Sequence, residues 1–255
     1  MVVPDIYRYC ERGNVKKANK WLAKHPNSDQ IGYITNTHNT ALMWACANNM
    51  PDVAMKLLAS GKSKPEQVNK IGNTAFIWAC SNGMQEVAKA IYETGKVDPG
   101  QINHYGCTAL LYTCYSNMPE MASILLATGK SKPEQINSYG NTALLWACVK
   151  KMPDIALALI ATGQSNPGQV NMQGETALLH ACMNNMPDIA MALLATGNAR
   201  PEQTNIDGYT AYNYARWNKM TEVVDILENY DDYIVKLHHK PNPYDDPNYV
   251  ITIDI

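Results

Sequence analysis

Apolar and polar positions along this chain follow a pattern that repeats every 34 residues. Thr recurs at this spacing from Thr40 to Thr210, and Met recurs in the same phase from Met50 to Met220. Asn and Gly keep the same period through the middle of the chain. Because four residue types share one spacing over most of the length, the sequence indicates an array of repeated units rather than two unrelated domains.

The sequence of each unit predicts two short helices followed by a long loop. In the clearest unit, apolar-rich stretches at 142–150 and 153–163 are separated only by Lys151-Met152. Residues 164–174 then contain one Pro and two Gly, which favour a loop. In the second helix, the apolar residues fall on one stripe that a neighbouring unit has to cover. The predicted order is therefore helix, tight turn, helix and loop.

The expected helix ends carry residues suited to them. The repeated Thr can cap the first helix through its hydroxyl, and a Pro opens the second helix in four units. Asn or Gly closes the first helix in most units because both tolerate a left-handed conformation. Lys151 and Lys219 suit that position less well. Since helices this short are not stable alone, stability is expected from contacts between units.

The order of elements resembles the ankyrin repeat more than the tetratricopeptide repeat, whose two long helices would leave no room for the loop. Ankyrin units read Thr-Pro-Leu-His-x-Ala-Ala, and residues 142–148 read Thr-Ala-Leu-Leu-Trp-Ala-Cys. Asp154-Ile155-Ala156 matches the acidic opening of the second helix. Residues 171–174, Asn-Met-Gln-Gly, stand where the family usually has Asp-x-x-Gly. The resemblance covers about residues 4–230, with one residue more per unit than the common repeat.

This resemblance implies an all-α repeat solenoid: a single elongated domain of stacked helix-turn-helix units with β-hairpin-like loops. We expect a degenerate N-terminal capping unit at 1–34, five regular repeats of 34 residues at 35–204, and a C-terminal capping repeat at 205–230. An acidic tail rich in Tyr and Pro follows at 231–255. The tail could pack on the last repeat, lie in the binding groove, or add a strand to a partner's sheet.

Composition narrows the classes of function. The chain is 46% hydrophobic and 17% charged, with a formal net charge of −2. Near-neutral charge argues against nucleic-acid binding and against electrostatic binding to a membrane. No apolar run approaches the roughly 18 residues of a membrane span. We therefore expect an intracellular protein of the reducing cytoplasm.

Cysteines recur with the same period, from Cys46 to Cys182, and Cys10 matches them in the first unit. They stand where the family prefers a small Ala, so they are expected to be buried thiols. Equivalent positions in stacked helices lie about 8–10 Å apart, too far for disulfides, which need Cα atoms within roughly 7 Å. No Cys-x-x-Cys pair suggests a metal site. Cys107 departs from the period, and we expect it to be the one reachable thiol.

A second periodic series consists of large, mostly aromatic residues: Trp44, Trp78, Tyr112, Trp146, His180 and Tyr214. Family units commonly carry a packed Leu at this position. We therefore favour a buried scaffold role for the series, with an aromatic ligand groove as the alternative.

The candidate binding residues are those that the period leaves free to vary. The resemblance implies binding through the loop tips and the exposed face of the first helix, which together form a concave surface. Exposed Tyr and Met clusters are typical of protein-binding surfaces, whereas scattered apolar residues mean little. The candidates for partner binding are Ile71, His104, Tyr105, Tyr115, Tyr139, Val149, Met172, Met183 and Trp217. Chance variation of the surface is the alternative.

Enzyme signatures are absent from the sequence: there is no Gly-rich phosphate loop, nucleophile elbow or His-Glu-x-x-His. We predict no catalytic residue, cofactor or metal, and no small-molecule substrate. The predicted function is non-enzymatic binding of a protein partner by a monomer, without nucleic acid or membrane. The first alternative is a structural or self-assembling scaffold. Less favoured are an adaptor or effector of viral or bacterial origin acting on host proteins, and a nucleic-acid binder.

Overall fold

The computed structural model describes residues 3–231 and 233, and over these residues all regular structure is helical. The first helices of the pairs are α1 (Asp5–Glu11), α3 (Ala41–Ala47), α5 (Ala75–Ser81), α7 (Ala109–Tyr115), α9 (Ala143–Val149), α11 (Ala177–Met183) and α13 (Ala211–Trp217). The second helices are α2 (Val15–Lys24), α4 (Pro51–Ala59), α6 (Gln85–Glu93), α8 (Pro119–Ala127), α10 (Pro153–Ala161), α12 (Pro187–Ala195) and α14 (Thr221–Glu228). A short 3-10 helix, η1 (Asp29–Gly32), follows α2.

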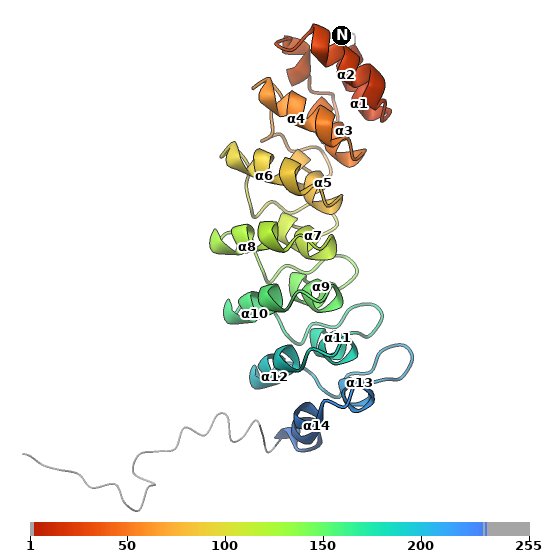
Figure 1. The fold of residues 1–255 in the computed structure, drawn as a ribbon, viewed down its shortest axis with the longest axis vertical. Helices are drawn as coiled ribbons and strands as arrows, with labels where there is room; N and C mark the ends of the chain where they lie inside the picture. The colour runs from red at the N-terminus through yellow and green to blue at the C-terminus, as the bar shows by residue number, and fades with distance from the viewer. Residues whose placement is uncertain (1–2, 232, 234–255) are drawn as a thin grey trace, which may run out of the picture.

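The helix pairs stack one upon the next into an elongated array (Figure 1). First helices pack against first helices, as α3 does on α5, and second helices pack against second helices, as α10 does on α12. The predicted all-α solenoid of stacked helix-turn-helix units is therefore confirmed. The expectations for the tail fall almost entirely outside the described residues, which include only 231 and 233 of that segment.

The helix ends form as the sequence predicted. Thr40 Oγ1 accepts a hydrogen bond from Met43 N at 3.2 Å, and Thr142 Oγ1 accepts one from Leu145 N at 3.1 Å. Pro opens α4, α8, α10 and α12, where the missing N–H has no helical partner to lose. The second residue after the first helix is left-handed whether it is Asn117, with φ of 55°, or Lys151, with φ of 56°.

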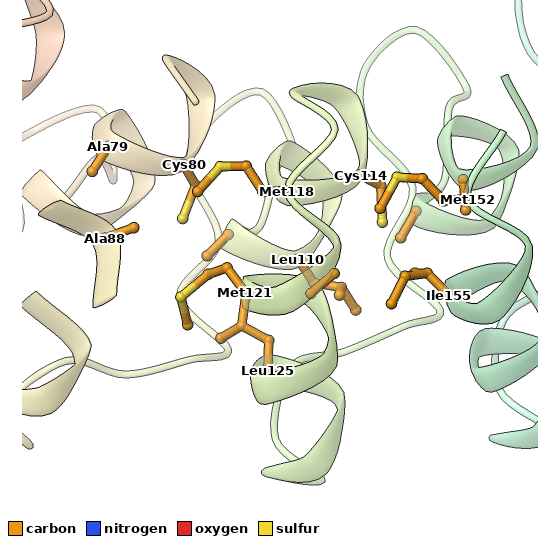
Figure 2. Close-up of a cluster of buried hydrophobic side chains, with 14 of the residues drawn as sticks. Ala79, Cys80, Ala88, Leu110, Cys114, Met118, Met121, Leu125, Met152 and Ile155 are labelled. Atoms are coloured by element: carbon orange, nitrogen blue, oxygen red, sulfur yellow. The ribbon is translucent and has the colours of Figure 1, made fainter. Parts of the chain in front are cut away.

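The core lies between units rather than within them. Figure 2 shows Met118 and Met121 of one unit beside Cys80 of the unit before, and Met152 beside Cys114. Side chains such as Leu110 and Met121 are completely buried. Full burial of one such side chain stabilises the fold by about 1.5–3 kcal/mol. Each helix pair therefore depends on its neighbours for most of its stability.

The periodic cysteines are fully buried between the first helices, and all seven cysteines of the chain are free thiols, as expected. The expectation that Cys107 is reachable was wrong, because only 5% of this residue is exposed. Asn103 Oδ1 accepts hydrogen bonds from Tyr105 N at 3.0 Å and from Cys107 N at 2.9 Å. These bonds curl the loop so that residue 105 stays outside and residue 107 turns inward.

Candidate functional site

From Asn69 onward, each loop turns through an asparagine whose side chain organises the tip, and Thr35 takes this place in the first loop. Asn137 Oδ1 accepts from Tyr139 N and from Asn141 N, both at 3.0 Å. Asn137 also closes the turn through its carbonyl, which accepts from Gly140 N at 2.9 Å. The Gly has φ of 79°, and a Cβ there would lie 2.8 Å from Asn171 Cα. The residue pair between Asn and Gly is thus held at the outer end of the loop.

Successive tips are tied to each other through the backbone. At every interface from the second unit onward, the first residue of one tip donates to a carbonyl of the preceding tip. The five bonds are Lys70 N to Thr37 O at 3.1 Å, His104 N to Ile71 O at 3.0 Å, Ser138 N to Tyr105 O at 2.9 Å, Met172 N to Tyr139 O at 3.0 Å, and Ile206 N to Gln173 O at 2.9 Å. The loops are therefore hairpin-like and fixed in a row without forming strands in the described residues.

The C-terminal ends of the first helices are tied in a similar way. After five of the first helices, the side chain of the next residue donates to a carbonyl at the end of the preceding first helix. We call these contacts the helix-end bonds: Asn48 Nδ2 to Cys10 O at 2.8 Å, Asn82 Nδ2 to Cys46 O at 2.8 Å, Ser116 Oγ to Ser81 O at 2.8 Å, Asn184 Nδ2 to Cys148 O at 2.9 Å, and Asn218 Nδ2 to Cys182 O at 2.8 Å. The tips and helix ends form one fixed surface, called here the tip–helix face.

The predicted binding residues all belong to the tip–helix face, but their exposure differs. Val149 and Met183 are half-buried, and His104 is exposed. The remaining six are large exposed residues: Ile71 at 40%, Tyr115 at 44%, Tyr105 at 53%, Trp217 at 58%, Tyr139 at 59% and Met172 at 68%. Sequence reasoning left out Ile206, which is 77% exposed at the tip of the last unit, although its register in the repeat is the same as that of Met172.

Three predicted residues, Tyr105, Tyr115 and Tyr139, meet in one pocket of about 430 Å³. The pocket lies between the unit of α7 and the unit of α9, and we call it the aromatic pocket. Its walls also include Tyr112 and Trp146 of the large-residue series, together with the side chains of Cys107, Asn137 and Asn141. The other predicted residues lie elsewhere on the tip–helix face, so the structure does not gather them into one site.

The rings of the aromatic pocket contact one another edge to face. The Tyr115 and Trp146 ring centroids are 4.9 Å apart at 83°, and those of Tyr112 and Tyr115 are 6.5 Å apart at 77°. The ammonium of Lys150 lies 5.3 Å from the Tyr115 centroid and 5.9 Å from the Trp146 centroid. Burial, together with the nearby Cys107 thiol, raises the pKa of Tyr112. This hydroxyl therefore stays protonated at neutral pH, and Lys150 is the charge at the pocket's rim.

A second aromatic cluster occupies the last unit. Trp217 lies 4.9 Å from Tyr209 and 5.2 Å from Tyr214 between ring centroids, and both contacts are edge to face. Tyr209 is 41% exposed and was not among the predicted residues. Tyr209 directly follows the tip glycine. The regular units carry Asn, Cys or Glu at this position, so the repeat pattern did not predict an aromatic contact there.

The large-residue series packs against the core, as the scaffold interpretation predicted. His180 is buried, and its Nε2 lies 3.2 Å from Glu175 Oε2. The other members are half-buried, and Trp44 Nε1 donates to Tyr7 Oη at 2.6 Å. Tyr112 and Trp146 line the aromatic pocket in addition to packing against the core.

Two other features are missing from residues 3–231 and 233. No group of three or more His, Cys, Asp or Glu side chains is arranged there to hold a metal ion. No helix in the same part of the chain is both long enough and apolar enough to cross a membrane.

Comparison with known proteins places this architecture among ankyrin repeats. A family profile described as ankyrin repeats in three copies matches residues 6–103, 95–167 and 160–236. The human ASB11 ankyrin repeat domain matches with a TM-score of 0.55 and 19% identity, over 89% of this chain and 97% of that one. The ankyrin repeat domain of Bcl-3 matches with a TM-score of 0.53 and 21% identity, over 88% and 98%.

A further similar structure comes from a complex of a predatory endopeptidase of Bdellovibrio bacteriovorus with an immunity protein. It matches with a TM-score of 0.54 and 21% identity, over 77% of this chain and 99% of the matched chain. No curated protein matches this chain. At these identities, the solved structures show a shared fold.

Proposed function

Because this chain belongs to the ankyrin-repeat family, whose members are in general non-enzymatic protein-interaction modules, we propose that it binds a protein partner through its tip–helix face. The observation that carries the proposal is the set of large apolar and aromatic side chains along this face, with Tyr105, Tyr115 and Tyr139 meeting in one pocket. Several such side chains converging on one face indicate a contact surface, whereas isolated ones do not.

The face is suited to binding because its backbone is already fixed. The bonds between successive tips and the helix-end bonds hold both borders of the face. A partner therefore meets a preformed surface, and little conformational entropy of the backbone is lost on association. Tyr side chains bury a large area with few rotatable bonds, which makes them effective anchors for a protein partner.

The similar structure from the endopeptidase–immunity protein complex fits this proposal, since it comes from a complex between two proteins. Its identity to this chain is only 21%, so the likeness supports protein binding in general and no particular partner.

Affinity capture with the tagged full-length chain tests the proposed surface. Wild type and Tyr105→Ala/Tyr115→Ala are compared in extracts of the cells that produce the protein, with mass spectrometry as the readout. The matched control is Met55→Ser/Leu157→Ser, which removes two exposed apolar side chains from second helices. We expect the tyrosine variant to lose partners that wild type and control retain. Equal recovery by all three would mean that the tip–helix face is not the binding surface.

A second candidate function is self-assembly through the last unit, which exposes Ile206 and Trp217 to 77% and 58%. Large apolar side chains exposed at the end of an array favour contact with another copy. Light scattering of wild type and Ile206→Ser/Trp217→Ser over a range of concentrations separates the candidates. A mass that rises with concentration in wild type alone supports self-assembly, and a constant monomer mass excludes it.

A further inference from the structure

Two sets of side-chain hydrogen bonds connect successive units, and both are interrupted at the same interface. The first set is the helix-end bonds. At the position that follows α9, the donor asparagine or serine is replaced by Lys150. Its ammonium lies over the Tyr115 and Trp146 rings rather than on the carbonyls at the end of α7. The interface between the α7 and α9 units therefore lacks the helix-end bond that all the other interfaces have.

The second set joins the loops, and we call its members the loop-amide bonds. Asn69 Nδ2 donates to Asn39 Oδ1 at 2.8 Å, Asn103 Nδ2 to Asn73 Oδ1 at 2.8 Å, and Asn171 Nδ2 to Asn141 Oδ1 at 3.1 Å. The equivalent bond of Asn137 would go to residue 107. That residue is a cysteine, so the amide nitrogen of Asn137 lacks the acceptor used at these three interfaces.

At the last interface the acceptor asparagine is also missing, but the donor finds a different acceptor. There Glu175 replaces the acceptor asparagine, and Asn205 Nδ2 donates instead to Tyr214 Oη at 3.4 Å. Among the described residues, no such substitute accepts from Asn137 Nδ2, and Asn137 is one of the residues that line the aromatic pocket. The two substitutions, Cys107 and Lys150, thus coincide with the pocket and leave polar donors around it.

A third donor at the pocket lacks an acceptor. The Trp146 side chain lines the pocket, and its indole N–H is buried with no hydrogen-bond partner among the described residues. The equivalent indole of Trp44, by contrast, donates to Tyr7 Oη at 2.6 Å. Leaving a buried donor unpaired destabilises a protein, so the interface between the α7 and α9 units is less well satisfied than the one at Trp44.

The charges on the surrounding surface have one sign. In the five regular units, we compare the two residues of each loop tip, and the last residue of each first helix with the residue that follows it. These positions include two lysines, Lys70 and Lys150, and no carboxylate. Carboxylates occur in these positions only in the end units of the array, as Glu11 in the first unit and Asp207 in the last, among the described residues. A partner with negative charge is therefore favoured at the middle of the face, and a partner with positive charge is disfavoured.

From these observations we infer that the aromatic pocket receives an acidic peptide segment of the partner, with an apolar or aromatic side chain between the tyrosines and a neighbouring Asp or Glu carboxylate toward Lys150 and Asn137. This inference rests on the proposed function and specifies its partner. The rings supply apolar contact, and the amide and ammonium donate hydrogen bonds to the carboxylate. The charge-assisted bonds from Lys150 make the acidic residue a determinant of specificity.

The test uses random peptides displayed on phage and selected on the immobilised full-length chain. The peptides that enrich are synthesised, and their affinity is measured for wild type, Lys150→Glu, Tyr139→Ser and Cys107→Asn/Lys150→Asn. The last variant restores the acceptor and the donor of both interrupted bonds without removing a ring. Lys89→Glu, on the exposed side of α6, is the matched charge control. Urea unfolding of each variant verifies that it is folded.

We expect enriched peptides that carry Asp or Glu beside a large apolar residue. Their affinity should fall by about tenfold or more in Lys150→Glu and in Tyr139→Ser, and stay unchanged in Lys89→Glu. Cys107→Asn/Lys150→Asn should bind them at least about tenfold more weakly while unfolding at a higher urea concentration, a combination that mere damage to the fold would not produce.

Other outcomes overturn the inference in distinguishable ways. Enriched peptides without acidic residues that still depend on Tyr139 would refute the acidic partner and leave the proposed function standing. Enriched peptides whose affinity is unchanged by Tyr139→Ser, by Lys150→Glu and by Tyr105→Ala/Tyr115→Ala would count against both. A synthetic peptide of residues 241–255, which carries acidic residues beside tyrosines, is measured separately. If it binds the pocket more tightly than every enriched peptide, the occupant is the chain's own segment rather than a partner.

Discussion

The side chain of Asn82 donates a hydrogen bond to the backbone carbonyl of Cys46 at 2.8 Å and so ties the end of α5 to the end of α3. The same nitrogen also contacts the carbonyl of Ala47 at 3.1 Å. Carbonyl groups at the end of a helix lack the i+4 partner of the helix interior, and among the described residues Cys46 O accepts otherwise only from Asn49 N at 3.2 Å. The Asn82 side chain thus adds a second bond to this carbonyl and ties two units together.

Replacing Asn82 by Ala should lower the free energy of unfolding by about 1–2 kcal/mol, because the carbonyls of Cys46 and Ala47 lose their side-chain donor and Cys46 O keeps only the bond from Asn49 N. Urea unfolding followed by circular dichroism measures this change. Lys150→Ala is the control at the equivalent position of the repeat, and only the weak cation–π contacts with the Tyr115 and Trp146 rings, about 0.5 kcal/mol each, are lost there. An equal loss in both variants would show that the helix-end bonds are not what connects the units.

Lys151 is left-handed, with φ of 56°, in a position where most units have Asn or Gly. Lys151→Gly should raise the free energy of unfolding by about 0.5–1 kcal/mol, since glycine adopts this conformation without a steric penalty. The comparison is Lys89→Gly inside α6, which should lower stability by about 1 kcal/mol. Destabilisation by both substitutions would contradict the account of how the first helix ends.

The two indoles at equivalent positions offer a matched pair. Trp44→Phe breaks the bond to Tyr7 Oη, whereas Trp146→Phe removes an N–H that has no partner. The loss of volume is the same, so Trp44→Phe should cost about 1–3 kcal/mol more stability than Trp146→Phe. Urea midpoints of the two variants give the difference directly. A larger loss in Trp146→Phe would mean that this indole has an internal acceptor after all.

Because the thiols are buried, the free energy of unfolding depends on pH in the alkaline range. Burial raises the pKa of the Cys10, Cys114 and Cys182 thiols to about 12. An exposed thiol in the unfolded chain ionises near pH 8.5. Above about pH 9 the unfolded chain has therefore lost protons that the folded chain keeps, and the free energy of unfolding falls as pH rises. Each buried thiol contributes up to about 1.4 kcal/mol per pH unit to this slope until its folded pKa is reached.

Cys114→Ala isolates one of these thiols. The free energy of unfolding is measured in urea at about pH 7.5, 9.5 and 10.5 in wild type and variant. The slope above pH 9 should be shallower in Cys114→Ala by about 1.4 kcal/mol per pH unit. Ser116→Ala serves as the control, because it removes a helix-end bond and shifts all values without changing the slope. Parallel curves for wild type and Cys114→Ala would show that this thiol is not protected by burial.

The sequence predicted the repeated architecture because its period is carried by residues with a local physical role. A Thr that caps a helix, an Asn or Gly in the left-handed conformation and an apolar stripe on a short helix each depend on only a few neighbouring positions. The sequence alone therefore predicts them. Even the exception at Lys151 was visible, because its side chain is disfavoured in the left-handed region that the repeat imposes there.

The site was predicted less completely, because a pocket depends on contacts between different units. Tyr105, Tyr115 and Tyr139 come from two units and were identified only as exposed residues, while their meeting with Trp146 depends on packing. Cys107 shows the same limit. Its place in a loop favoured exposure, but hydrogen bonds to Asn103 turn it inward.

The most direct test of the tip–helix face as the binding surface is photo-crosslinking from single positions in the producing cell. A photoreactive phenylalanine analogue is placed at Tyr105 or Tyr139, and at Met55 or Leu157 on second helices as controls. The account predicts that a partner protein is covalently captured from positions 105 and 139 and not from 55 and 157. Capture only from positions 55 and 157 would contradict it.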